Sequence, residues 1–154
     1  MAGLVADLDA WQPPVGEAHA QLARVKRPAG IKTTTLRLAP VEQTIYTVKA
    51  KLLLCRREAD GDYHLVLQDL ATDSTIVAEI PDPTRVSTAS PWKSLIRKAR
   101  TSFAAQFHPT SARKDEGLML ITVRGVGFFD KRHDSEGAAL NGLELHPILR
   151  YSTP

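Results

Sequence analysis

The sequence predicts a mainly β domain in which five strands form a small barrel and a single helix lies between the third and fourth strands. Three observations lead to this prediction. Apolar and polar residues alternate over residues 45–54, as they do in a half-buried strand. Apolar residues recur at helical spacing over residues 92–107, and two further apolar runs follow at 118–129 and 143–148. The expected order is therefore three strands, one helix and two strands.

The first strand is the longest alternating segment, and a hairpin follows it. The pair Asp60-Gly61 readily supplies the backbone conformation of a tight hairpin turn. Residues 63–68 then form the second strand, with Leu65 and Leu67 facing inward and His64 facing outward. In the first strand every second residue is expected to face the interior, namely Tyr46, Val48, Ala50, Leu52 and Leu54.

The third strand, at residues 75–80, ends at Pro81, and a helix follows. Ser90-Pro91 predicts the helix start, with serine as the N-cap and proline as the first helical residue. His108-Pro109 ends the helix. Its expected apolar face consists of Trp92, Leu95, Ile96, Ala99, Phe103 and Phe107, whereas Lys93, Arg97 and Arg100 are expected to point to solvent.

Two strands separated by a long polar loop complete the domain. Gly125 and Gly127 predict a bulge or bend inside the fourth strand, and Asn141-Gly142 predicts a turn into the fifth. A five-stranded Greek-key barrel with a helix between strands three and four matches the OB-fold, in which the helix would plug the open end. An SH3-like barrel is the main alternative, but it lacks a long helix at this place.

The chain divides into three regions. Residues 1–43 form an N-terminal arm, residues 44–150 form the OB-like barrel domain, and residues 151–154 form a short tail. Prolines interrupt the arm, although residues 17–25 could form two helical turns and residues 33–38 an edge strand. We expect the arm to pack on the domain or on a partner.

The composition fits a single soluble domain, since 43% of the 154 residues are hydrophobic and 24% are charged. Cys55 is the only cysteine, which excludes a disulfide framework within the chain. Asp7 and Asp9 stand where a secretory signal needs cations and an apolar core. No apolar run approaches the roughly 18 residues of a membrane span. We therefore expect a cytoplasmic protein without membrane contact.

The net charge of +3 is small, but the cations are unevenly distributed. Residues 44–90 are net acidic, whereas residues 93–100 and the arm are basic. Segregated charge of this kind either marks a polyanion-binding face or is only a solvated surface. The cations of the arm, here called the basic arm, are Arg24, Lys26, Arg27, Lys32 and Arg37.

Five short segments have an unusual residue order: DYHLVLQD at 62–69, AEIP at 78–81, ARTSF at 99–103, VRGVGFFD at 123–130 and NGLELHP at 141–147. Together they resemble an uncharacterised family of small bacterial proteins with an OB-like fold, over roughly residues 45–148. Members typically follow FFD with a histidine and then GQTGVAPNG. Here His133 is kept, but residues 134–136 and Leu140 depart from that pattern. The resemblance implies the domain limits and brings no known activity.

Several polar residues are expected to share one outer face of the barrel. Imidazoles beside carboxylates bind zinc or another divalent ion, and they also form general acid–base pairs. The alternative is that these side chains hydrogen-bond to one another and hold the long loop in place. Because no His-x-x-x-His or Cys-x-x-Cys spacing supports metal, we predict a structural polar face with no metal, no cofactor and no catalytic residue. The residues are His64, Glu79, Asp130, His133, Glu144 and His146.

Nucleic-acid binding is the usual role of such a barrel, through the face of strands two and three and the loops beside it. Such a site needs stacking aromatics and cations. Strands two and three carry acids, however, and Phe128 or Phe129 also fits the core. The candidate ligand-binding residues are Tyr63, His64, Phe129, Lys131, Arg132 and His133.

We therefore predict a non-enzymatic binding module whose partner is a single-stranded nucleic acid or an acidic protein. One alternative is a protein–protein adaptor that docks through the long loop and the arm. A second alternative is a metal-dependent hydrolase that uses the His/Glu/Asp face.

Overall fold

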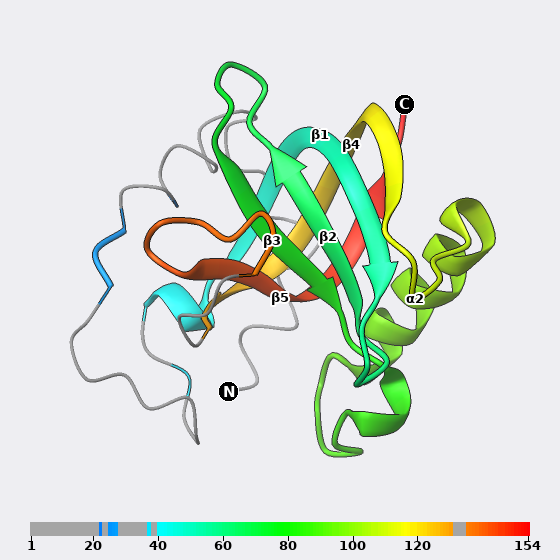
Figure 1. Ribbon diagram of the computed structural model, residues 1–154. Helices are drawn as coiled ribbons and strands as arrows, with labels where there is room; N and C mark the ends of the chain where they lie inside the picture. Colours follow the sequence, from blue (N-terminus) through cyan, green and yellow to red (C-terminus); the bar gives the residue numbers. More distant parts are fainter. Residues whose placement is uncertain (1–21, 23–24, 28–36, 38–39, 131–134) are drawn as a thin grey trace.

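The computed structural model describes residues 22, 25–27, 37, 40–130 and 135–154 of the chain (Figure 1). Their strands follow one another around a central core, and the helix α2 lies beyond one end of the sheet. The elements are η2 (Val41–Gln43), β1 (Ile45–Arg57), β2 (Tyr63–Gln68), β3 (Thr75–Ile80), η3 (Pro83–Arg85), α2 (Lys93–Phe107), β4 (Lys114–Phe129) and β5 (Leu143–Ser152).

The five strands form a closed barrel in the order β1-β2-β3-β5-β4, in which β4 pairs with β1. Neighbouring strands are antiparallel except for β3 and β5, which run parallel and meet at Ala78 and Leu145. The predicted mainly β architecture is confirmed, with a closed five-stranded sheet and a helix between β3 and β4.

The alternation predicted for β1 holds only as far as Leu52. The pairing of β1 with β2 and β4 shifts between Leu52 and Leu54, as at a β-bulge. An extra residue reverses which side chains face inward, because successive residues of a strand point to opposite faces. Cys55 therefore joins the core cluster in place of the predicted Leu54. Leu54 lies opposite Val66 on the outer side of the sheet and is buried there.

Both C-terminal strands are longer than predicted. β4 begins at Lys114 rather than at residue 118, because Lys114 pairs with Cys55 near the end of β1. β5 continues through Ser152, beyond residue 148 and into the segment assigned to a tail. Tyr151 packs against Phe103 of the helix, with ring centroids 5.3 Å apart, and so anchors this extension.

The predicted bend in β4 is confirmed. The pairing of β4 with β5 shifts on both sides of Gly125, and the second shift ends at Gly127. A Cβ on Gly127 would lie 2.5 Å from the carbonyl oxygen of Val41, which is too close for any side chain. Glycine at this position therefore lets η2 pack directly against β4.

Helix α2 closes one end of the barrel. Phe103 and Phe107 are buried in the same cluster as the inward-facing strand residues, and Ile96 and Ala99 are also buried. The predicted apolar face is confirmed, although Trp92 and Leu95 are only partly buried.

The start of the helix and its basic side differ from the prediction. The first helical residue is Lys93, which makes Trp92 the N-cap residue. The Trp92 side chain does not cap the helix by a hydrogen bond. Ser90 instead accepts a hydrogen bond from the Trp92 backbone N–H at 3.3 Å, so the N-cap prediction is wrong. Arg100 does not point to solvent either: its guanidinium lies 3.8 Å above the Tyr63 ring and donates to the carbonyls of Ile80 and Gly61.

Within the described residues, no helix combines the length and the apolar character that crossing a bilayer requires.

Candidate functional site

A cluster of imidazole and carboxylate side chains lies on the outer face of β2, β3 and β5. Glu79 of β3 is directly opposite His64 of β2, and its Oε1 is 3.3 Å from His64 Nδ1. The second carboxylate oxygen of Glu79, Oε2, is 3.1 Å from Nδ1 of His146 on β5. Glu79 therefore bridges two histidines that come from different strands.

His146 is surrounded by three carboxylates. Its Nδ1 is also 3.2 Å from Oε1 of Glu144, and its Nε2 is 3.8 Å from Oδ2 of Asp62. Glu144 is buried, whereas His146 remains about a quarter exposed. We call Asp62, His64, Glu79, Glu144 and His146 the polar cluster.

Burial and hydrogen bonding act in opposite directions on the pKa values of this cluster. Burial alone would raise the pKa of Glu79, but the hydrogen bonds with His146 and His64 outweigh it and lower the pKa to about 2. Burial alone would lower the pKa of His146, but Glu144 and Glu79 raise it to about 10. For Glu144 burial dominates and raises the pKa to about 7. Near neutral pH the cluster thus contains a charged Glu79–His146 pair.

The loop between β4 and β5 covers part of this face. The backbone carbonyl of Glu136 lies 3.1 Å from Nε2 of His64, and His64 is almost completely buried. A Cβ on Gly137 would lie 2.4 Å from a methyl carbon of Val66, and Gly137 has a φ of +84°. The loop therefore lies directly on β2, over the face where we expected a nucleic acid to bind.

Neither predicted stacking ring is available in this arrangement. Tyr63 is buried beneath Arg100 and packs towards Phe103, with centroids 6.0 Å apart. Phe129 is buried in the core, with the guanidinium of Arg27 5.8 Å from its ring centroid. The three other candidates, Lys131, Arg132 and His133, lie outside the described residues.

Asp130, which we expected on the polar face, lies at the end of β4. Its backbone N–H donates to the Gly142 carbonyl at 3.0 Å, and its charge contributes to the raised pKa of Glu144. It therefore influences the polar cluster electrostatically.

Two cations of the basic arm bind the domain's backbone. Arg37 donates to the carbonyls of Gly127 and His146, at 3.1 and 2.8 Å, and its guanidinium lies over the rings of Trp92 and Phe128. Arg27 donates to the Asn141 carbonyl at 3.4 Å. These two side chains thus fasten the arm to the domain. Lys26 is exposed, and Arg24 and Lys32 lie outside the described residues.

One pocket reaches the polar cluster, and another lies at the start of β3. The first, of about 420 Å³, reaches His146 and Asp62 and is also lined by Trp92, Arg37 and Arg85. It gives solvent a route to the polar cluster.

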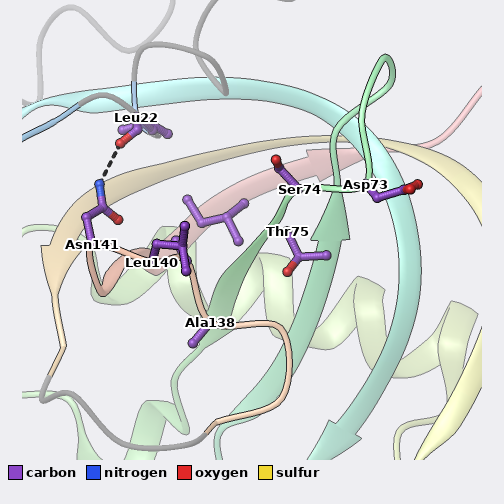
Figure 2. A pocket seen from close by; sticks show the side chains of 9 residues that line it. Leu22, Asp73, Ser74, Thr75, Ala138, Leu140 and Asn141 are labelled. Carbon is purple, nitrogen blue, oxygen red and sulfur yellow. Dashed lines mark hydrogen bonds between the residues drawn. The ribbon is translucent and has the colours of Figure 1, made fainter.

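The second pocket, of about 440 Å³, lies between the start of β3 and the loop at 138–141 (Figure 2). Figure 2 shows the Asn141 side chain directed at Leu22, to whose carbonyl its Nδ2 donates at 2.8 Å. Leu140 lines this pocket and is fully exposed.

A different surface carries cations on three neighbouring strands, β1, β4 and β5. Val48 and Ala50 of β1 are core residues. Lys49 and Lys51, which alternate with them along the strand, therefore lie on the outer side of β1. Arg124 of β4 is directly opposite Thr47 of β1 and Arg150 of β5. The sequence has no Asp or Glu in β1, in residues 117–129 or in residues 147–152. We call Lys49, Lys51, Arg124 and Arg150 the basic face.

The sequence pattern did not reveal two participants. Asp62 belongs to the polar cluster, but its position beside Asp60-Gly61 indicated only a hairpin turn. Arg37 was predicted only as one of the cations of the basic arm, and the folded chain shows its contacts with the carbonyls of Gly127 and His146.

The polar cluster can exchange protons and can offer nitrogen and oxygen ligands to a cation. Cys55 is not suited to nucleophilic chemistry, because burial and the neighbouring Glu116 raise the pKa of its thiol to about 12.

Neither the known protein-family models nor the curated proteins include one that matches this chain.

Proposed function

We propose that the protein is a non-enzymatic binding module that holds a single-stranded nucleic acid on the basic face of an OB-like Greek-key barrel. The strand order β1-β2-β3-β5-β4 and the helix packed under one end of the closed sheet support the OB-like assignment. The proposal moves the binding surface away from β2 and β3, where the chain's own loop lies.

The grouping of cations on neighbouring strands, without a carboxylate in those strand segments, carries this proposal. Arg124 and Arg150 are opposite one another in the sheet. Like charges in directly opposite positions of a sheet repel one another, so this pairing concentrates positive charge on the surface. A phosphate bound near both side chains would be attracted by the two positive charges together.

The spacing of the cations suits an extended polyanion. Lys49 and Lys51 are two residues apart on one strand, which places them roughly 7 Å from each other along β1. Arg124 follows on the adjacent strand, diagonally from Lys49. The Nε of Arg124 is buried and has no hydrogen-bond partner among the described residues. The surface therefore offers a row of positive charges rather than a single anion site.

Salt dependence tests the proposal. Each phosphate contact to a single strand contributes roughly −0.7 to the slope of log affinity against log salt concentration. Lys49→Ala combined with Lys51→Ala should therefore flatten the slope by about 1.4, measured by fluorescence anisotropy with a labelled mixed-sequence oligonucleotide.

The matched control is Arg97→Ala combined with Lys98→Ala, because it removes the same charge from the exposed side of α2. It should leave the slope nearly unchanged. Equal slopes for both double variants, or no binding by the native protein at low salt, would contradict the proposal.

A protein–protein adaptor is the second candidate, favoured by Leu140. This side chain is fully exposed at the edge of a pocket of about 440 Å³, and an exposed apolar side chain beside a pocket suits docking of a partner. A partner bound in this way should be lost with Leu140→Asp and retained with the Lys49/Lys51 double variant. The reverse pattern would exclude the adaptor.

A further inference from the structure

We propose that Asp62, Glu79 and His146 bind one divalent transition-metal cation. A ligand atom of each residue lies within 4.8 Å of a ligand atom of the other two. Asp62 directly precedes β2, and the other two residues belong to β3 and β5, so that the closed sheet brings the three together. This inference is independent of nucleic-acid binding, because it concerns a different face of the barrel.

The distance between Asp62 and His146 fits two ligands of a shared ion better than a direct contact. Oδ2 of Asp62 and Nε2 of His146 are 3.8 Å apart, which exceeds the length of a hydrogen bond. Two ligand atoms that each lie about 2.0–2.2 Å from one ion are separated by roughly 3 to 4 Å. An ion placed between these two atoms would therefore need only small movements of Asp62 and His146. Glu79, whose Oε2 lies 3.1 Å from Nδ1 of His146, would turn a carboxylate oxygen towards the Nε2 side to complete the site.

Hydrogen bonds already hold both ligands in place. Oδ1 of Asp62 accepts the Asp82 backbone N–H at 2.9 Å, which leaves Oδ2 directed towards His146. On the other side of the imidazole, Nδ1 lies 3.2 Å from the buried Glu144 and 3.1 Å from Oε2 of Glu79. A carboxylate on the far nitrogen is the usual support of a metal-binding histidine, since it fixes the ring's orientation. Glu144 is thus a positioning residue in this proposal.

The charges of the polar cluster leave room for a cation. A histidine that binds a metal ion is neutral, so in the occupied site the three carboxylates of Asp62, Glu79 and Glu144 face at most one positive charge from the histidines, on His64. A divalent ion would offset this excess. The pocket of about 420 Å³ reaches both Asp62 and His146, so that an ion can enter from solvent.

The donor set indicates which ions fit. One imidazole nitrogen and two carboxylate oxygens suit Zn²⁺ or Mn²⁺, whereas Mg²⁺ and Ca²⁺ prefer oxygen ligands alone. Three protein ligands leave further coordination positions for water or for a ligand in the pocket.

Equilibrium dialysis of the full chain against ZnCl₂, MnCl₂ and MgCl₂ tests the proposal. The native protein should bind one Zn²⁺ or Mn²⁺ per chain and should bind Mg²⁺ more weakly. Asp62→Asn should lose at least tenfold in affinity, because it keeps the Oδ1 acceptor and removes the charged ligand. Glu144→Gln should lose about 10–100-fold, as supporting partners of metal-binding histidines do.

His108→Asn is the matched control, since His108 is an exposed histidine at the end of α2 with a φ of 49°, which asparagine tolerates. It should bind metal like the native protein. Circular dichroism shows whether each variant is folded, and Asp62→Asn leaves the contacts of His146 with Glu79 and Glu144 intact. Absence of stoichiometric binding by the native protein, or equal binding by folded Asp62→Asn, would overturn the proposal.

Discussion

Replacing Glu79 by glutamine removes the carboxylate that bridges His64 and His146 and should lower the stability of the protein in a pH-dependent way. Folding lowers the pKa of Glu79 from 4.5 to about 2. One pKa unit corresponds to about 1.36 kcal/mol, so the ionised carboxylate stabilises the fold by on the order of 3 kcal/mol at neutral pH. The Glu79 side chain is only 18% exposed, so solvent screens this interaction weakly.

The pH at which this stabilisation disappears follows from the direction of the shift. Because the folded pKa lies below the unfolded one, the contribution is fully present above about pH 4.5 and is lost as the pH falls towards 2. Glu79→Gln should therefore be less stable than the native protein by roughly 3 kcal/mol at pH 7 and by less than half of that at pH 3.

Urea unfolding at both pH values measures this difference, with EDTA present so that bound ions do not contribute. Asp115→Asn is a suitable control, because its side chain is 72% exposed and a surface ion pair contributes about 0–1 kcal/mol. A difference below 1 kcal/mol at pH 7, or one that is equally large at pH 3, would refute the assigned role of Glu79.

Three further predictions concern the fold. Phe103→Ala should lower the free energy of unfolding by about 3–5 kcal/mol, since the ring is fully buried between the helix and the sheet, while Arg97→Ala should change it by less than about 0.5 kcal/mol. Gly137→Ala should speed amide hydrogen exchange in the loop that covers β2, because the added Cβ would collide with Val66 and the positive φ disfavours alanine. The Cys55 thiol, with its pKa raised to about 12, should react with a disulfide reagent at pH 8 only after denaturant is added; rapid reaction of the folded protein would show that the thiol is accessible.

The architecture could be predicted from the sequence because it rests on local periodicity. Inward-facing Leu65 and Leu67 alternate with His64, and Phe103 and Phe107 recur at helical spacing, so strand and helix faces follow from the order of residues. A bulge inside an apolar run leaves no such signal. Leu52, Leu53, Leu54 and Cys55 are all compatible with the core, and only pairing with β2 and β4 decides that Cys55 faces inward.

The candidate sites could be predicted only in part, because their geometry depends on contacts between distant segments. Alternation placed His64 and Glu79 on an outer face, and the structure brings them together. The alternation of residues could not indicate that residues 135–142 would cover that face. The functions expected for Tyr63 and Arg37 likewise depended on exposure, and both side chains are engaged in tertiary contacts.

The polar cluster and the basic face differ in their side-chain chemistry, so the metal-binding proposal and the nucleic-acid proposal can be tested independently. The polar cluster combines carboxylates and imidazoles on β2, β3 and β5, whereas the basic face combines cations on β1, β4 and the end of β5. A nucleic acid should be repelled by the carboxylates and attracted by the cations. Metal binding and nucleic-acid binding can therefore be lost separately, through Asp62→Asn and through the Lys49/Lys51 double variant.

The most direct test of the central claim is a titration of the isotopically labelled protein with a short single-stranded oligonucleotide, followed by NMR. Binding to the basic face predicts that the largest amide shift changes cluster at Lys49, Lys51, Thr122 and Arg124, which neighbour one another across β1 and β4. Changes confined to other parts of the described sheet, such as residues 66–77 of β2 and β3, or no changes at low salt, would contradict the claim.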